Sequence, residues 1–424
     1  MLDKNITFAI NTANNELENL KLLLHSLKKN LHVSTHEILV FVDSDNQGTY
    51  EWLKSIKGDF HDLKIITHSL PPCIGYSRNN NLLVELAKYD IVSYLQSDMV
   101  ISPGYDTDVV RDLEDNCILS ATRVEPPLHG ESPQTITKDF GLDPEDFDFE
   151  EWNKYSPTVK EEKESNYFFA PLTFYKKVWL DVGGYNTAFR RSREDSDLVQ
   201  RCVHKGIKLK QTHNAIVYHF TCTSSRGKDW HNPNNAEAQA RVEYQKMADM
   251  IELKRFIRRW GNFNHGEAKL EKYDIDLCIK NSVNFQPNFT TQIEPLFSRL
   301  WLDSDLKELY SIVEKEHDIA NMLLGFSEEQ WKDANKFYNV DDYSGIFNNI
   351  SDFNEEYNIK VELDASNFIQ ADANVLNNIH AIISQTDVGD YEYGNIIFRI
   401  KNKKLISSAQ MTNPEFDKKL LKIE

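Results

Sequence analysis

The sequence is poor in cysteine. Its 424 residues include five cysteines, an odd number, and no two of them form a CxxC pair. Disulfide-rich scaffolds depend on several paired cysteines, and cysteine-ligated zinc sites depend on closely spaced pairs. The sequence therefore predicts a protein of a reducing compartment, with neither a disulfide framework nor a cysteine zinc site.

Long hydrophobic runs are also missing. No stretch approaches the ~18 consecutive apolar residues of a membrane-spanning helix. The first residues, MLDKNITFAINTANNE, contain no basic stretch followed by an apolar one, so no signal peptide is expected. We therefore expect a cytoplasmic protein. Peripheral membrane contact is left open, because residues 247–260 predict a helix with clustered basic side chains.

The chain has no surplus of basic residues. Lys plus Arg total 48 and Asp plus Glu total 66, so the formal net charge is −18. Nucleic-acid binders normally carry the opposite sign, so no nucleic-acid partner is expected. Residues 266–424 carry 16 basic and 28 acidic residues (net −12), against 32 and 38 (net −6) for residues 1–265. This shift, next to a predicted helix end, predicts two domains, 1–265 and 266–424.

The first domain alternates strand and helix signals. Strands are expected at 6–10, 37–42, 63–67 and 89–95, and helices at 16–27, 49–56 and 77–87. Repeated β-α-β units with continuous apolar strands indicate an α/β fold, with a mostly parallel, Rossmann-like sheet covered by helices on both faces. Ligands bind such sheets just beyond the carboxyl ends of the strands, here residues 11–16, 43–49 and 96–103.

Two regions carry weaker signals. Residues 139–164 hold ten carboxylates and show little periodicity, so they form either a solvated surface insertion or a mobile flap beside the site. Residues 266–424 predict an α+β domain of unknown role, without a chemical motif. Its expected elements are helices at 301–324, 327–337 and 375–384, a strand at 359–363, and a hairpin made of 395–400 and 405–409.

Two polar side chains follow predicted strands and suit a metal ion. Asp98 comes just after the strand at 89–95, where a carboxylate can hold a divalent cation that bridges a diphosphate. His219 follows an apolar run at 215–218, and if it faces Asp98 the two would suit manganese or a similar ion. Taken singly, each also reads as an ordinary turn carboxylate or structural histidine.

A pair of carboxylates, Glu194 and Asp195, precedes a helix predicted at 197–205. Carboxylates at a helix N-terminus stabilise the helix dipole by roughly 0.3–1 kcal/mol, which accounts for them without any function. A carboxylate can also serve as a general base that takes the proton from an attacking hydroxyl. Both interpretations stay open from these residues alone.

Six short motifs follow one another within about residues 5–225. They are 10–16 (INTANNE), 42–49 (VDSDNQGT), 75–79 (GYSRN), 96–98 (QSD), 182–185 (VGGY) with 194–197 (EDSD), and 217–219 (VYH). Their order along the chain resembles the family-2 type of glycosyltransferases with the GT-A fold. The resemblance implies an enzyme that moves a sugar from a nucleoside-diphosphate sugar to an acceptor hydroxyl, with inversion and with Mn²⁺ or Mg²⁺ as cofactor.

The resemblance also implies residue roles. Asp195 would be the catalytic base and Glu194 would help to hold the acceptor, while Asp98 and His219 would bind the metal ion. The nucleotide sugar would be held by residues at the other motif positions. They are Thr12, Glu16, Asp43, Asp45, Arg78, Gln96 and Ser97. A later loop could close over the donor through Arg226, Lys228 and Trp230, or it is an ordinary surface loop.

Some features depart from the family pattern. Gln96 stands where the family has the first Asp of its D-x-D motif, and an amide is a poor metal ligand. It motivates an alternative, a catalytically inactive GT-A-like module that binds sugars or a partner. A nucleotidyltransferase and a dehydrogenase are disfavoured, because residues 11–16 contain neither glycine nor a cation. The acceptor is expected to be a glycan or glycoconjugate, and homo-oligomerisation is left open.

Overall fold

The chain divides into two compact units. The computed structural model describes residues 4–70, 73–128, 132–166, 168–190, 192–221, 231–263, 268–322 and 344–424. The first unit is Met1–Met247 together with Thr412–Glu424, and the second is Ala248–Met411. The division falls inside helix α9 (Ala236–Trp260), ahead of the boundary expected at residue 265. The return of residues 412–424 to the first unit has no counterpart in the sequence prediction.

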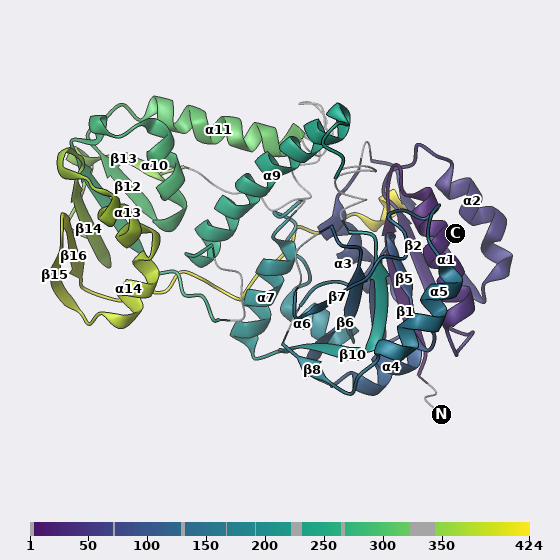
Figure 1. Cartoon of the computed structure of the whole chain (residues 1–424). Helices are drawn as coiled ribbons and strands as arrows, with labels where there is room; N and C mark the ends of the chain where they lie inside the picture. The colour runs from purple at the N-terminus through teal and green to yellow at the C-terminus, as the bar shows by residue number, and fades with distance from the viewer. Residues whose placement is uncertain are drawn as a thin grey trace. The chain divides into compact units, whose positions relative to one another are not determined.

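The first unit is built on an 11-stranded sheet (Figure 1). At its centre β3 (Asp62–His68), β2 (Glu37–Val42), β1 (Ile6–Thr12) and β4 (Ile91–Gln96) lie side by side and parallel. The remaining strands are β5 (Met99–Ile101), β6 (Cys117–Glu125), β7 (Thr135–Thr137), β8 (Glu164–Ser165), β9 (Leu172–Tyr175), β10 (Lys208–His219) and β17 (Leu421–Ile423). This arrangement confirms the α/β class and the mainly parallel sheet.

The strands and helices of the first unit could be predicted because their apolar residues are buried in a regular pattern. Every residue of β2 is buried, as a continuous apolar strand requires, and the α1 leucines 20, 23, 24 and 27 all face the core. The helices of this unit are α1 (Leu17–Asn30), α2 (Thr49–Ile56), α3 (Tyr76–Leu86), α4 (Tyr105–Asp112), α5 (Phe149–Tyr155), α6 (Lys176–Val182) and α7 (Glu194–Lys205). Helix α7 starts three residues before the predicted position, so Glu194 and Asp195 belong to its first turn.

The acidic segment 139–164 is packed against the sheet by its aromatic residues. Phe140 and Trp152 are buried and join Tyr218 of β10 in a separate hydrophobic cluster. The Tyr218 hydroxyl donates to the carbonyl of Gly141 at 2.7 Å. The expectation of a solvated insertion therefore fits its carboxylates but not its aromatic side chains.

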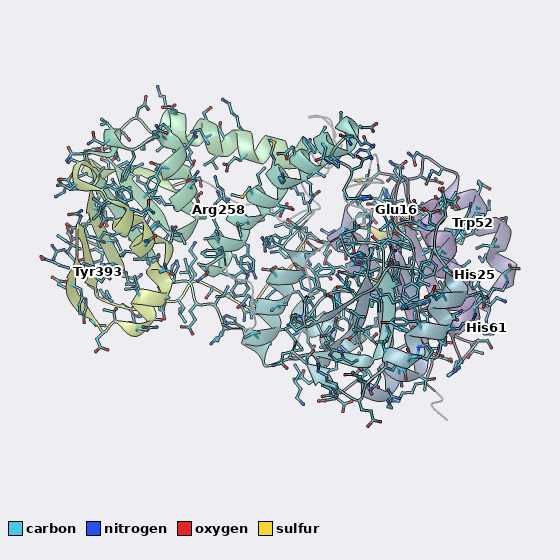
Figure 2. All side chains as sticks on the ribbon, viewed as in Figure 1. Glu16, His25, Trp52, His61, Arg258 and Tyr393 are labelled. Atoms are coloured by element: carbon cyan, nitrogen blue, oxygen red, sulfur yellow. The ribbon has the colours of Figure 1, made fainter. Side chains whose placement is uncertain are left out.

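The second unit has a six-stranded sheet. Strands β13 (Phe347–Asn349), β12 (Arg299–Leu302), β11 (Ile275–Lys280) and β14 (Ile359–Asp364) are parallel, and β16 (Ile396–Ile400) and β15 (Gly389–Tyr393) add an antiparallel hairpin. Tyr393 projects from this hairpin at the edge of the sheet (Figure 2). The helices are α10 (Pro287–Ile293), α11 (Lys307–Met322), α13 (Gln370–Asn377) and α14 (Ile379–Gln385).

Several predictions for this part of the chain were wrong. Residues 299–302 form a strand, so the helix expected at 301–324 begins only at Lys307. The hairpin partner of β16 is β15, whereas Leu405 makes only an isolated bridge to Tyr273. The helix expected at 375–384 is split between α13 and α14. The helix expected at 327–337 lies outside the described residues.

The basic residues near the end of α9 already have acidic partners within the second unit. Arg258 makes two hydrogen bonds to Glu294, at 2.7 and 2.6 Å, and Lys254 pairs with Glu316. These pairs reduce the positive charge on which binding to an anionic membrane would depend. Across the residues the structure describes, no helix is long and apolar enough to cross a membrane.

A buried histidine should make the stability of the second unit depend on pH. His380 accepts a hydrogen bond from the Tyr273 amide at Nδ1, 3.1 Å away, and its Nε2 lies 2.7 Å from the carbonyl oxygen of Leu296. Burial lowers its pKa from 6.5 to about 3, and the charge of Lys272 adds to this effect. The unfolded chain thus binds one more proton than the folded chain between these two pH values.

We therefore expect the free energy of unfolding to rise with pH between about 3 and 6.5, by at most ~1.4 kcal/mol per pH unit from this group. The check is thermal unfolding across this range for the wild type and His380→Gln, which removes the titration. The variant should show the shallower pH dependence. Identical pH dependence in both proteins would contradict the prediction.

Candidate active site

The pairing of β10 with β5 brings His219 beside Asp98. His219 lies opposite Met99 in this antiparallel pair, and the Phe220 amide donates to the carbonyl of Asp98 at 3.1 Å. As a result Asp98 Oδ1 and His219 Nε2 lie 3.8 Å apart, and both residues are buried. Two metal–ligand bonds of about 2.1 Å can span this distance.

Glu125 completes this arrangement and was missed by the sequence analysis. It ends β6, the parallel neighbour of β10, and its Oε1 lies 2.8 Å from Nδ1 of His219. A carboxylate that receives the Nδ1 proton leaves the Nε2 lone pair directed toward Asp98. Metal-binding histidines are commonly held by a carboxylate in this way, because it fixes the tautomer and the ring orientation.

The residues present fit a divalent cation held partly by substrate. Among the residues that the structure describes, no group of three or more His, Cys, Asp or Glu side chains could hold a metal ion. Asp98 and His219 would therefore supply two ligands and leave the other positions to phosphate oxygens and water. Mg²⁺ and similar ions are often held in this manner, by one or two carboxylates and a phosphate-bearing substrate.

Glu16 and Ser97 form a partly buried polar contact next to Asp98. Glu16 Oε2 accepts hydrogen bonds from Ser97 Oγ at 2.8 Å and from the Ala13 amide at 3.1 Å (Figure 2 labels Glu16). Burial raises the pKa of Glu16 to about 7, and the charge of Asp98 raises it further. The buried Thr12 ends β1 beside them. The ends of β1 and β4 thus contribute polar groups to the same edge of the sheet.

Asp43 and Asp45 shape the loops at this edge. The carboxylate of Asp43 accepts hydrogen bonds from the amides of Ile74 and Gly75, at 2.7 and 3.1 Å, and lies 2.9 Å from Nε2 of His68. It therefore fixes the turn into α3, where Gly75 has φ 86°. That conformation suits glycine because it has no Cβ.

Asp45 caps the start of α2. It accepts hydrogen bonds from the amides of Gln47, Thr49 and Tyr50, at 3.0, 2.9 and 2.9 Å. Partial burial raises its pKa, but these amides outweigh that effect and hold the pKa below its usual value. A role of either carboxylate in binding the nucleotide stays a prediction.

A cluster of tyrosines connects the strand β4 with the start of α7. The Tyr94 hydroxyl donates to the Tyr76 hydroxyl at 2.5 Å, and Gln96 Nε2 donates to the same oxygen at 3.4 Å. Burial raises the pKa of Tyr76, and the charges of Tyr185, Glu194 and Asp195 raise it further. The two carboxylates therefore lie close enough to Tyr76 to raise its pKa. The amide of Gln96 serves this network as a donor, which a carboxylate could not do.

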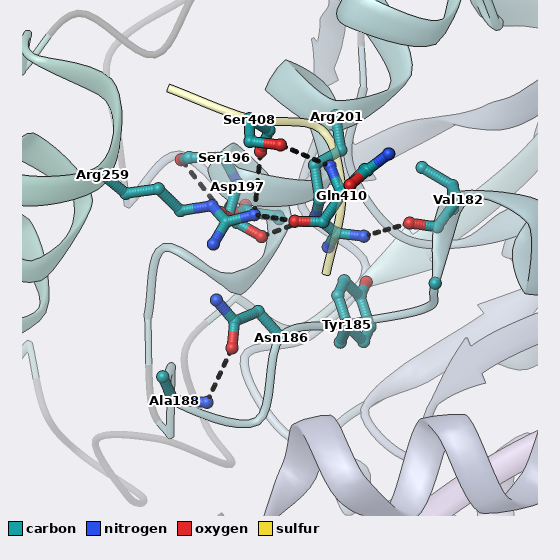
Figure 3. Close-up of polar contacts among 12 residues, drawn as sticks. Val182, Tyr185, Asn186, Ala188, Ser196, Asp197, Arg201, Arg259, Ser408 and Gln410 are labelled. Carbon is teal, nitrogen blue, oxygen red and sulfur yellow. Dashed lines mark hydrogen bonds and ion pairs between the residues drawn. The ribbon is translucent and has the colours of Figure 1, made fainter. Parts of the chain in front are cut away.

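Helix α7 is anchored beneath the carboxylate pair. Arg201 donates from Nε to Asp197 at 2.7 Å and from Nη1 to the carbonyl of Val182 at 2.7 Å (Figure 3). Both members of this ion pair are fully buried. Asp195 Oδ1 accepts from the Ser196 amide at 2.6 Å. This anchoring fixes the first turn of α7 and with it the backbone of Glu194 and Asp195.

The structure thus brings most of the predicted residues to one edge of the first unit's sheet. Asp98 and His219 face each other, and Glu16, Ser97 and Thr12 lie beside them. Arg78 is buried on α3 and donates from Nη1 to the carbonyl of Pro414 at 2.6 Å. Arg226, Lys228 and Trp230 lie outside the described residues.

Part of the first unit is similar to a known protein family. Residues 9–194 match the model of glycosyl transferase family 2. A comparison with curated proteins gave no match. Among solved structures, S. aureus TarS 1–349 in complex with UDP is 14% identical, with a TM-score of 0.39 over 83% of this chain and 98% of that one. GalNAc-T7 with UDP, GalNAc and Mn²⁺ is 12% identical, with a TM-score of 0.38 over 51% and 43%.

The matched range begins within β1 and ends at the first residue of α7. It contains Asp98 and the other motif positions, except those that come after Glu194. The sequence prediction of a family-2 glycosyltransferase is thereby confirmed. Within the first unit, residues 9–194 are thus similar to glycosyl transferase family 2, the class of enzyme that the sequence analysis predicted.

Proposed function

We propose that the first unit transfers a sugar from a nucleoside-diphosphate sugar to an acceptor hydroxyl, with inversion and with Mn²⁺ or Mg²⁺ as cofactor. The observation that carries this proposal is the array of buried Asp98 and His219 with the half-buried Glu125 at the carboxyl edge of the sheet. The acidic pair Glu194 and Asp195 begins α7 and lies near Tyr76, whose hydroxyl accepts a hydrogen bond from Gln96 at the end of β4. One group of side chains thus suits a diphosphate, and the other suits an attacking hydroxyl.

On the donor side, Asp98 and His219 would hold the metal ion while Glu125 keeps the imidazole in its binding tautomer. When bound, such an ion neutralises the charge that develops on the leaving diphosphate. Thr12, Glu16, Ser97 and Gln96 provide polar groups around this position, and Arg78 provides a cation. Asp43 and Asp45 keep the loops before α3 and α2 in place for the nucleoside.

On the acceptor side, Asp195 would take the proton of the acceptor hydroxyl and Glu194 would hold the acceptor. The hydroxyl oxygen then forms a bond to C1 of the sugar as the bond between C1 and the diphosphate oxygen breaks. A single displacement of this kind inverts C1 and uses no covalent enzyme intermediate. It depends on a base and a leaving-group stabiliser on opposite sides of the sugar.

A donor screen tests the function. The full chain is incubated with Mn²⁺ and a panel of UDP-, GDP- and TDP-sugars, and free nucleoside diphosphate is measured with and without a chelator. We expect slow release from one donor that the chelator abolishes. Release that is equally fast with the chelator would contradict metal dependence. If the protein binds the nucleotide in a metal-dependent way but releases no nucleoside diphosphate with any of the glycan acceptors added, the alternative of a non-catalytic module is favoured.

The acceptor is proposed to be a glycan or glycoconjugate, and the protein is proposed to act in the cytoplasm without a nucleic-acid partner. The net charge of −18 opposes binding to polyanions. The strongly acidic segment 266–424 makes an anionic glycan a poor acceptor for the same reason.

A further inference from the structure

The segment that follows the second unit returns to the first unit and contacts it along its whole length. Residues Leu421–Ile423 form β17, which pairs antiparallel with β3 at the edge of the sheet. The Ile65 amide donates to the carbonyl of Glu424, and the Glu424 amide donates back to Ile65, both at 2.9 Å. Phe416 and Leu421 pack against the hydrophobic core, and Lys418 pairs with Glu85.

Asn413, at the start of this segment, holds the loop 183–190 by both ends of its side-chain amide. Its Oδ1 accepts from the Thr187 amide at 3.0 Å and from the Thr187 hydroxyl at 3.1 Å. Its Nδ2 donates to the carbonyls of Tyr185, at 2.8 Å, and Gly183, at 3.3 Å. All of these partners are on one short stretch of chain between α6 and α7.

This loop leads directly to the first turn of α7, which holds Glu194 and Asp195. It carries Tyr185, whose ring lies against that of Tyr76 with the centroids 5.9 Å apart. Burial raises the pKa of both tyrosines, and the charges of Glu194 and Asp195 raise it further. Asn186 bends the loop by accepting from the Ala188 amide at 3.0 Å (Figure 3). Ser77 and Asn81 of α3 hold the loop by hydrogen bonds to the carbonyls of Phe189 and Tyr185. Asn413 adds hydrogen bonds to the same loop from the C-terminal segment.

The residue after Asn413 contacts the proposed donor side. The carbonyl of Pro414 accepts from Arg78 Nη1 at 2.6 Å. A buried guanidinium held by a backbone carbonyl keeps its charge and has a fixed direction. Two consecutive residues of the returning segment therefore contact the loop that precedes α7 and the Arg78 side chain of the proposed donor side.

We propose that Asn413 is a positioning residue of the glycosyltransferase site, which fixes the loop 183–190 and, through it, the start of α7. This inference rests on the proposed function of Glu194 and Asp195. Asn413 contacts no reacting atom. It acts by holding the backbone that sets the place of the base, and small displacements of a catalytic group are costly to the rate.

The test uses the full chain with three variants. Asn413→Ala removes all four hydrogen bonds. Asn413→Asp keeps an acceptor for Thr187 but sets a carboxylate against the carbonyls of Tyr185 and Gly183. Lys418→Ala is the control, because it removes an exposed ion pair of the same segment without contacting the loop. Transfer kinetics and amide hydrogen exchange are measured for each.

We expect both Asn413 variants to lower kcat about ten- to a hundredfold, while KM for the donor changes less than about threefold. Exchange over residues 185–188 should become about tenfold faster in the same variants. Lys418→Ala should match the wild type in both readouts. The Asp variant has nearly the volume of the native residue, so it serves if the Ala variant does not fold.

The proposal is overturned if either folded Asn413 variant keeps both the wild-type kcat and the wild-type exchange over this loop. It is also overturned if Lys418→Ala produces the same losses, since the effect would then be one of general stability. A wild-type chain without transfer on any donor would count against the proposed function. The exchange result would still decide whether Asn413 holds the loop.

Discussion

Replacing Asp195 with Asn is expected to reduce sugar transfer by about 10²–10⁴-fold while nucleotide binding stays nearly unchanged. The amide has almost the same shape but cannot accept a proton from the acceptor hydroxyl. Asp195 lies in the first turn of α7, which Arg201 anchors through Asp197 and Val182, so the change should leave the backbone in place. The measurement is kcat for transfer together with calorimetric binding of the nucleoside diphosphate.

A matched control is available on the neighbouring helix. Asp181 on α6 is exposed and pairs with Lys177, so Asp181→Asn removes the same charge from a position away from the site. This control should retain wild-type kcat. If Asp195→Asn also turned over at the wild-type rate, the base would have to be another residue, and Glu194 would be the first to examine.

The elements of the first unit follow from local sequence. Strand β2 was predicted with its exact bounds, because all six of its residues are apolar or buried and polar loop residues flank them. In a sheet covered on both faces, the order of apolar and polar residues in a strand indicates how deeply that strand is buried. The second unit gave weaker signals, since β12 is only four residues long and alternates between buried and half-buried positions.

Long-range contacts account for what the sequence could not provide. The motif positions Asp98 and His219 were predicted together, since a family pattern connects residues that are far apart in the chain. Glu125 belongs to no quoted motif, and only the pairing of β6 with β10 places it behind His219. Asn413 is more distant still, because its partners at 183–187 are more than two hundred positions earlier in the sequence.

The structure also gives a physical reason for Gln96, which stands where the family pattern has an aspartate. In the sequence it weakened the expected metal site, because an amide is a poor ligand. In the fold its Nε2 donates to Tyr76, which also accepts from Tyr94. The position thus supports the tyrosine network near Glu194, and the proposed metal site would rely on Asp98 and His219 alone.

The proposed metal site leads to a graded prediction with two variants. Asp98→Asn removes the charge of a proposed metal ligand, whose carboxylate lies 3.8 Å from His219, so metal-dependent transfer should fall by at least about 10²–10³-fold. Glu125→Gln keeps an oxygen that can accept from Nδ1 of His219 but removes the charge behind the ring. Loss of such a supporting carboxylate typically weakens metal binding about 10–100-fold.

Titration of transfer activity with Mn²⁺ separates these two effects. Glu125→Gln should require a higher Mn²⁺ concentration and then approach the wild-type rate, because its ligands remain. Asp98→Asn should stay slow at every concentration, because a ligand to the ion is lost. Equal behaviour of both variants and the wild type would refute the metal site. Recovery of Asp98→Asn by added Mn²⁺, without recovery of Glu125→Gln, would reverse the two roles and make Glu125 the ligand that holds the ion.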